Sequence, residues 1–197
     1  MANIIGGGTP KTSNPAYWNG NIDWFTPAEI GTGIYAYSSV RKITEAGYKA
    51  CSATMLPADK TILFTSRAGI GSASILRRSA CTNQGFQSLV VHDNEDVYFI
   101  YSITPSIKRW AEVHASGSTF LEISGPVLSG MKIQIPSLAE QRLIGTFFRD
   151  VDDLITLHQC KGEKSGAPGI RVSQVPQYTA HQWFGACLQF YAKLIKG

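Results

Sequence analysis

The chain contains 197 residues, of which 44% are hydrophobic and 11% aromatic, so it can build a proper core and is not a disordered chain. No stretch approaches the ~20 apolar residues of a membrane span, and the N-terminus lacks the pattern of a secretory signal. The four cysteines lie at wide, irregular spacings. These spacings fit neither a disulfide framework nor a zinc site, so we expect free thiols in a reducing cytoplasm.

The charge is unevenly distributed along the chain. The formal net charge is +4. Residues 1–158 contain 13 Lys and Arg residues and 13 Asp and Glu residues, whereas residues 159–197 contain five Lys and Arg residues against Glu163 alone. The balance over residues 1–158 permits nucleic-acid binding without predicting it.

The most distinctive segment comes first in the chain, over residues 6–27. It combines three consecutive glycines, three prolines and a run of hydroxyl and amide side chains with the aromatic residues Tyr17, Trp18, Trp24 and Phe25. This composition predicts a shaped loop with polar groups at its tip and an aromatic base beneath. Loops held on a rigid scaffold often carry recognition; an ordinary surface turn is the alternative interpretation.

A hairpin follows in the middle of the chain. Residues 61–65 (TILFT) are β-branched and apolar, residues 67–71 (RAGIG) break the pattern, and residues 74–76 resume it. We expect two strands with Arg67 near the tip of their turn. Residues 88–92 predict a further strand.

The next segments are less regular. Residues 97–103 carry apolar side chains on both faces and fit either a strand or a buried helix. Residues 105–115 predict a helix with Ile107, Trp110, Ala111 and His114 on one face. Residues 131–135 predict another strand.

The clearest element begins after Pro136. Ser137 and Glu140 have the spacing of a capping box. An apolar stripe then recurs at helical spacing, which predicts an amphipathic helix over residues 137–159, broad enough to pack on the body and on a second helix. The stripe consists of Leu143, Phe147, Val151, Leu154 and His158, widened by Ile144, Phe148 and Ile155.

After residue 159 the character changes, because glycines and prolines stop any helix. We therefore divide the chain into a mixed, strand-rich domain (1–136), the helix (137–159) and an atypical tail (160–197) that is frame-shifted, truncated or artificial in origin. The fold class expected is α/β (α+β).

No catalytic or metal-binding constellation is visible in the sequence. The four histidines are scattered, and none has a metal-ligand spacing to another His or Cys. Asp150, Asp152 and Asp153 cluster, but on the side of the helix expected to be solvated. The glycine-rich segments match neither a phosphate-binding nor a dinucleotide-binding loop. We therefore expect no catalytic residue, no metal and no cofactor.

The polar loops are the candidate binding elements. Lys and Arg suit phosphate and guanine, Asn and Gln suit adenine, and Ser and Thr suit either; turn formation or capping is the structural alternative for each residue alone. The candidate DNA-binding residues are Lys11, Thr12, Ser13, Asn14, Ser66, Arg67, Gln84, Gln87, Ser116 and Ser118.

In combination, these motifs resemble the specificity subunit of type I restriction–modification systems. The resemblance covers residues 6 to about 159, where five short motifs occur in the family's order. They are GGTPKTSNPxYW at 7–18 with WxTP at 24–27, ILFTSRAGIG at 62–71, NQGF at 83–86, SGSTFxEIS at 116–124, and IPxLxEQ at 135–141, followed by GTFF and DDLI in the helix.

The resemblance implies that the chain reads double-stranded DNA and does no chemistry. Methylation then belongs to modification subunits that use S-adenosylmethionine, and ATP- and Mg²⁺-dependent cleavage to the restriction subunit. A full specificity subunit carries two recognition domains separated by two long antiparallel helices. This chain has one such domain, residues 1–136, so we expect it to read half of a bipartite site. The helix at 137–159 would either pair with a second copy through Leu143, Phe147, Val151 and Leu154, which gives a homodimer, or pack its stripe on its own domain.

Two other functions remain open from the sequence. A non-catalytic interaction or assembly module would share the scaffold without salt-dependent duplex binding. A small enzyme using the aspartates or a histidine would show activity as an isolated chain.

Overall fold

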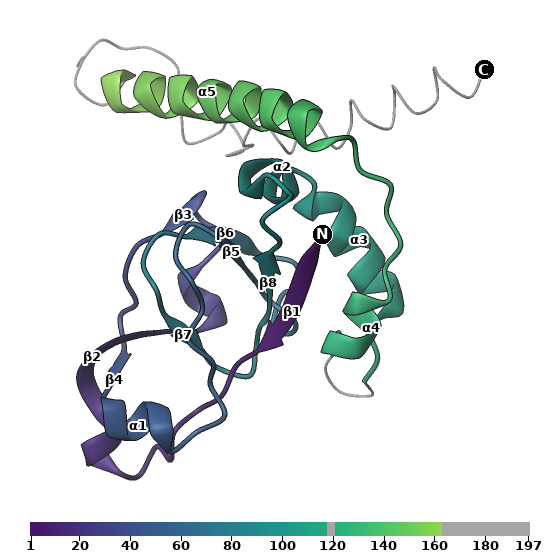
Figure 1. Ribbon diagram of the computed structural model, residues 1–197. Coiled ribbons are helices and arrows are strands. Elements are labelled where there is room, and N and C mark those ends of the chain that lie inside the picture. Colours follow the sequence, from purple (N-terminus) through teal and green to yellow (C-terminus); the bar gives the residue numbers. More distant parts are fainter. Residues whose placement is uncertain (118–120, 163–197) are drawn as a thin grey trace.

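The computed structural model describes residues 1–117 and 121–162 (Figure 1). Its main sheet has the strand order β1-β8-β5-β6-β3, in which β3 is parallel to β6 and the other neighbours are antiparallel. The long-range pair β1–β8 has the register Ile4↔Leu89. The strands are β1 (Ala2–Gly6), β3 (Tyr35–Ala36), β5 (Thr61–Phe64), β6 (Ala73–Leu76) and β8 (Gln87–Val91).

A smaller sheet forms a second part of the domain, which, with the helix and turns around it, we call the small lobe. Its order is β4-β2-β7, with β2 (Trp18–Phe25) antiparallel to β4 (Lys42–Ile43) and parallel to β7 (Cys81–Thr82). The short 3₁₀ turns η1 (Pro15–Tyr17) and η2 (Pro27–Glu29) flank β2. Helix α1 (Glu45–Lys49) covers this lobe, at the end of the domain away from the long C-terminal helix (Figure 1).

The main sheet is buried on both faces, as the side chains of β5 show. Ile62 and Phe64 point into a large core beneath the helices, whereas Leu63 points to the opposite side with Phe25 and Phe86. Alternate side chains of a strand lie on opposite faces, so a strand covered on both sides is apolar throughout. The helices over the large core are α2 (Val97–Ser102), α3 (Thr104–His114), α4 (Gly125–Ser129) and α5 (Leu138–Gly162).

The structure confirms the predicted hairpin strands, the strand at 88–92 and the helix at 105–115, which is α3. Residues 97–103 form helix α2, one of the two alternatives. The carboxylate of Asp96 caps this helix by accepting a hydrogen bond from Phe99 N (2.8 Å), which decides for a helix over a strand.

The predicted strand at 131–135 is wrong. Met131, Ile133 and Ile135 do alternate, and they pack against the large core. The segment has no strand assignment, because it is an extended connection from α4 to α5 with no ladder partner. Apolar alternation reports a buried side, not backbone pairing.

Helix α5 begins as the capping box predicts. Ser137 N donates to Glu140 Oε2 (3.0 Å), and Ser137 Oγ donates to the same oxygen (2.7 Å). These hydrogen bonds also lower the pKa of Glu140. The helix continues to Gly162, three residues past the predicted end. Most of the tail, residues 163–197, lies outside the described residues.

The prediction that all three aspartates of α5 are solvated is wrong for Asp152. This residue is buried and accepts a hydrogen bond from Tyr98 Oη on α2 (2.7 Å). Burial and this hydrogen bond raise the pKa of Tyr98. About two turns earlier, a Cβ at Gly145 would lie 2.4 Å from Asp96 Oδ1. The helix is therefore docked closely on α2 and does not project freely.

Gln141 completes this contact at the start of α5. Its side chain is buried, accepts from Asp96 N (3.0 Å) and donates to Glu95 (2.6 Å) and to the Pro136 carbonyl (2.9 Å). Polar contacts with fixed partners define one register more sharply than apolar packing alone. Among the helices in residues 1–117 and 121–162, none has the length and hydropathy to cross a membrane.

Candidate functional site

The glycine-rich first loop lies directly on the backbone of the 82–87 turn. Gly8 N donates to Thr82 O (2.9 Å). A Cβ at Gly7 would lie 2.0 Å from Asn83 O, so only glycine permits this approach. Gly7 therefore seats the first loop on residues 82–83, and Gly8, whose Cβ would lie 2.6 Å from Ala53 N, seats it on residues 52–53.

Two tryptophans support this loop from beneath, as the sequence predicted. Trp24 Nε1 donates to Gly8 O (2.8 Å), and Trp18 Nε1 donates to Lys11 O (3.4 Å). Both side chains are buried, and their rings meet edge-on at 5.1 Å. Each indole fixes one carbonyl of the loop, so the position of Lys11 is set by the core of the small lobe.

The hairpin turn at 65–72 is shaped by its own hydrogen bonds. Thr65 Oγ1 donates to Gly69 O (2.6 Å) and accepts from Ser72 N (2.9 Å). Ala68 has φ 53° and Gly69 has φ 101°. An alanine in the left-handed region is strained, and it presents its neighbour Arg67 at the tip of a tight, preorganised turn.

Backbone hydrogen bonds join these segments into one continuous group. Ser66 N donates to Gly85 O (2.8 Å), and Ile123 N donates to Ser66 O (3.0 Å). Thr9 Oγ1 donates to Gln84 Oε1 (2.5 Å). We call residues 7–14, 65–72, 82–87, 116–117 and 121–124 the loop array. Segments that are widely separated in sequence thus meet, as expected of a composite recognition surface.

The predicted contact residues differ in their access to solvent. Ser66 is completely buried, so its side chain cannot contact a macromolecule, and its inclusion is corrected. Ser118 lies outside the described residues. Exposed are Lys11, Thr12, Ser13, Gln84 and Ser116, and half-buried are Asn14, Arg67 and Gln87.

Some of these side chains also have structural partners. Asn14 Oδ1 caps η1 by accepting from Ala16 N (3.1 Å). The Gln87 amide lies against two glycines, since a Cβ at Gly125 would lie 2.9 Å from its Oε1. Arg67 Nη1 lies 3.8 Å from Glu122 Oε2. These three candidate residues therefore have contacts within the domain itself.

Sequence reasoning missed Arg41. Its guanidinium lies 3.8 Å from the centroid of the Trp18 ring and is exposed, so it sits on the aromatic base that also holds Lys11. The adjacent basic pair at 41–42 was the available signal. Its neighbour Lys42 is committed elsewhere, because its amine contacts the buried Asp23 carboxylate at 2.8 Å.

Asp23 shows why Lys42 is held in place. Burial raises the pKa of this carboxyl, but the hydrogen bonds from Lys42 and from the Ser38–Ser39 segment outweigh burial and lower it below its usual value. The carboxylate is therefore ionised and paired inside the small lobe. Arg41 is left as a cation of this lobe directed at solvent.

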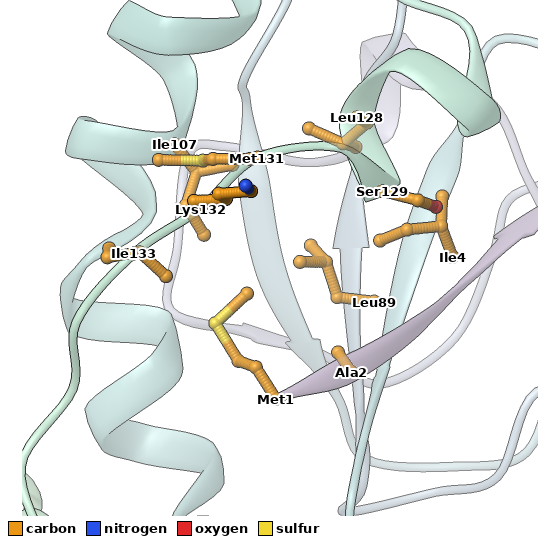
Figure 2. A pocket seen from close by; sticks show the side chains of 10 residues that line it. All are labelled: Met1, Ala2, Ile4, Leu89, Ile107, Leu128, Ser129, Met131, Lys132 and Ile133. Carbon is orange, nitrogen blue, oxygen red and sulfur yellow. The ribbon is translucent and has the colours of Figure 1, made fainter.

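The described residues hold no arrangement suited to metal chemistry. Within residues 1–117 and 121–162, no group of three or more His, Cys, Asp or Glu residues could hold a metal ion. A pocket of about 370 Å³ lies between β1, β8, α3, α4 and residues 131–133 (Figure 2). Its lining side chains are apolar except for those of Ser129 and Lys132, so it lacks the converging polar side chains of a catalytic site.

Helix α5 presents a second surface. Leu143, Phe147 and Leu154 of the predicted pairing stripe are exposed, as is Leu157. Val151 is half-buried and packs on the large core with Ile144 and Ile155. The stripe is therefore divided between an inner side on the domain and an outer apolar side.

Comparison with known families identifies this architecture. The model of the type I restriction modification DNA specificity domain matches residues 1–164. The chain belongs to this family. The match takes in the loop array and all of the residues that the structure describes.

Named relatives agree with this family assignment. This chain is 38% identical over 160 residues to the type I restriction enzyme MjaIX specificity subunit of Methanocaldococcus jannaschii, and the match covers 79% of this chain and 37% of the relative. It is 27% identical over 157 residues to the EcoR124I/EcoR124II specificity subunit of Escherichia coli, covering 76% and 38%. The specificity domain thus spans less than two fifths of the length of these relatives.

Solved structures support the same fold. A chain from work on complex assembly and conformational transition of the type I R-M system superposes with a TM-score of 0.63 at 20% identity, covering 82% of this chain and 39% of that one. The HsdS subunit from Thermoanaerobacter tengcongensis gives a TM-score of 0.54 at 17% identity, covering 82% and 37%. The mixed α/β fold of the specificity domain is therefore that of specificity subunits.

Proposed function

We propose that this specificity domain reads one half of a bipartite DNA target through the loop array. The observation that carries the proposal is the joining of segments from four parts of the sequence into one preorganised group. This group is rich in hydroxyl and amide side chains and carries two cations, Lys11 and Arg67. Duplex recognition needs such groups for phosphates and base edges together.

Roles within the array, and for Arg41 beside it, follow from placement. Lys11 and Arg41 flank the Trp18 ring on the small lobe, and both are exposed; we assign them to phosphate, which positions the domain on DNA. Arg67 and Gln84 lie on the tight hairpin turn and the neighbouring turn, and we assign them to base edges. Guanine suits the arginine, and adenine suits the glutamine.

The domain itself does no chemistry in this proposal. Modification subunits supply methylation with S-adenosylmethionine, and the restriction subunit supplies ATP- and Mg²⁺-dependent cleavage, all in the cytoplasm. The specificity domain selects the DNA and docks these partners. Its membership in the family and the polar character of the loop array support this division.

Duplex binding should depend on salt and on Lys11. Because a half-site offers few contacts, the isolated chain should bind in the non-specific range, with Kd about 10⁻⁴–10⁻⁶ M. Lys11→Ala and Arg41→Ala should each weaken binding to all sequences alike and flatten the salt slope by about one. Gln84→Ala should cost ~1–3 kcal/mol on the preferred sequence only. The measurement is fluorescence anisotropy over a salt series, with modification subunits added, using duplexes selected from a random library.

Lys60→Ala is the matched control for this series. Lys60 precedes β5, at the end opposite the hairpin turn, and pairs with Asp93. Its removal should leave binding unchanged. If the assembly selects no sequence and the variants bind like the parent chain, the loop array is purely structural. The domain would then be an interaction module.

We also propose that α5 pairs with a second copy of the chain, which would bring two recognition domains together. The outer residues Leu143, Phe147 and Leu154 support a closed two-fold contact. Phe147→Asp should convert a dimer to a monomer in light scattering. Thr146→Asp adds the same charge at the neighbouring exposed position and should leave the dimer intact. A parent chain that is monomeric at all concentrations contradicts the pairing.

A further inference from the structure

Glu122 places a carboxylate in the middle of the loop array. Its Oε2 lies 3.8 Å from Arg67 Nη1, and both side chains are about half-exposed. Arg67 is the arginine that the tight hairpin turn presents. A carboxylate at this place is unexpected in a surface meant for polyanionic DNA, because it repels phosphate.

The separation of the two side chains is fixed by their backbones. Ile123 N donates to Ser66 O (3.0 Å), which ties together the residues next to Glu122 and Arg67. Glu122 N donates to Ser116 O (3.0 Å), and Ser116 N donates to Glu122 O (3.1 Å). Ser66 and Ile123 are completely buried. Both side chains therefore extend from backbone segments that are held in place by hydrogen bonds.

Stability does not account for this pair. Exposed ion pairs contribute little to folding stability, since solvent screens them. The carboxylate matters more for what Arg67 can bind than for the stability of the fold. At this separation the two groups interact through their charges and do not share a hydrogen bond. The carboxylate offsets the guanidinium charge that attracts any phosphate, while the donors of the planar fork stay available for a pair of acceptors.

We propose that Glu122 is a positioning residue that makes Arg67 selective for a guanine edge over backbone phosphate. A guanine offers two acceptors, O6 and N7, to the free edge of the guanidinium. A phosphate that approaches the same edge is repelled by the negative charge of the carboxylate. Specificity then arises from an attractive and a repulsive element together. This inference rests on the proposed DNA-reading function.

The test compares Glu122→Gln with the parent chain in complex with modification subunits. One duplex is selected from a random library and the other is its scrambled form. Glu122→Gln should tighten binding to the scrambled duplex, steepen the salt slope by about one, and lower the ratio of the two affinities by roughly 10-fold. Glu122→Asp keeps the charge and should recover part of the ratio.

Arg67→Ala supplies the second arm of the experiment. In that background Glu122→Gln should leave the affinity ratio unchanged, because the carboxylate acts on selectivity through the arginine. An equal effect with and without Arg67 overturns the inference. So does a Glu122→Gln protein that discriminates like the parent. A parent complex that selects no sequence at all instead overturns the proposed function.

Discussion

Trp24→Ala is expected to lower the free energy of unfolding by about 3–5 kcal/mol, the usual cost of removing a buried aromatic side chain. Trp24 is 3% exposed and packs edge-on against Trp18 in the core of the small lobe. Its indole N–H also holds the Gly8 carbonyl. The loss should appear as a lower urea midpoint of the full chain.

Trp24→Phe separates the two contributions. It keeps most of the packing and removes the hydrogen bond, which should cost about 1–3 kcal/mol because Gly8 O is left buried without its donor. DNA affinity measured where this variant is fully folded should fall as for Lys11→Ala, because the first loop loses its support. A Trp24→Phe protein with parental stability would contradict the role given to the indole.

Phe148→Ala is the second large effect, also about 3–5 kcal/mol. Phe148 is 5% exposed and belongs to the large core, where it fastens α5 to the domain. Its neighbour Phe147 is 62% exposed and is a matched control on the same helix. Phe147→Ala should change stability by no more than about 0.5 kcal/mol in conditions where the chain is monomeric.

The comparison can be made by chemical denaturation monitored by circular dichroism at 222 nm. If Phe148→Ala unfolds α5 alone, a separate transition should precede that of the sheet. If Phe147→Ala and Phe148→Ala lower the free energy of unfolding equally, the side of α5 assigned to the core is wrong. The two substitutions remove the same atoms, so only their surroundings can distinguish them.

The features predicted correctly from sequence depend on short-range chemistry. The capping box at Ser137 and Glu140, the hairpin at 61–76 and the aromatic base under the first loop involve residues close in the chain. The missed features depend on distant partners. Asp152 looked solvated because its partner, Tyr98, lies on another helix, and residues 131–135 alternate without a strand to pair with.

The candidate site divides in the same way. Composition identified the loops, and the family resemblance placed them in one surface, but neither could tell that Ser66 is enclosed by Gly85 and Ile123. Arg41 was missed because its position depends on Trp18, which approaches it only across the small sheet. Access to solvent is a property of the assembled domain.

The pairing of β1 with β8 has a consequence for synthesis of the chain on the ribosome. Gly6 pairs with Gln87, and Ala2 pairs with Val91, so the first strand made has no neighbour until the eighth has emerged. The glycine-rich loop that follows β1 is likewise seated only when residues 82–83 arrive. Closing so long a segment slows folding. The loop array therefore cannot assemble until β8 and residues 121–124 have also been made.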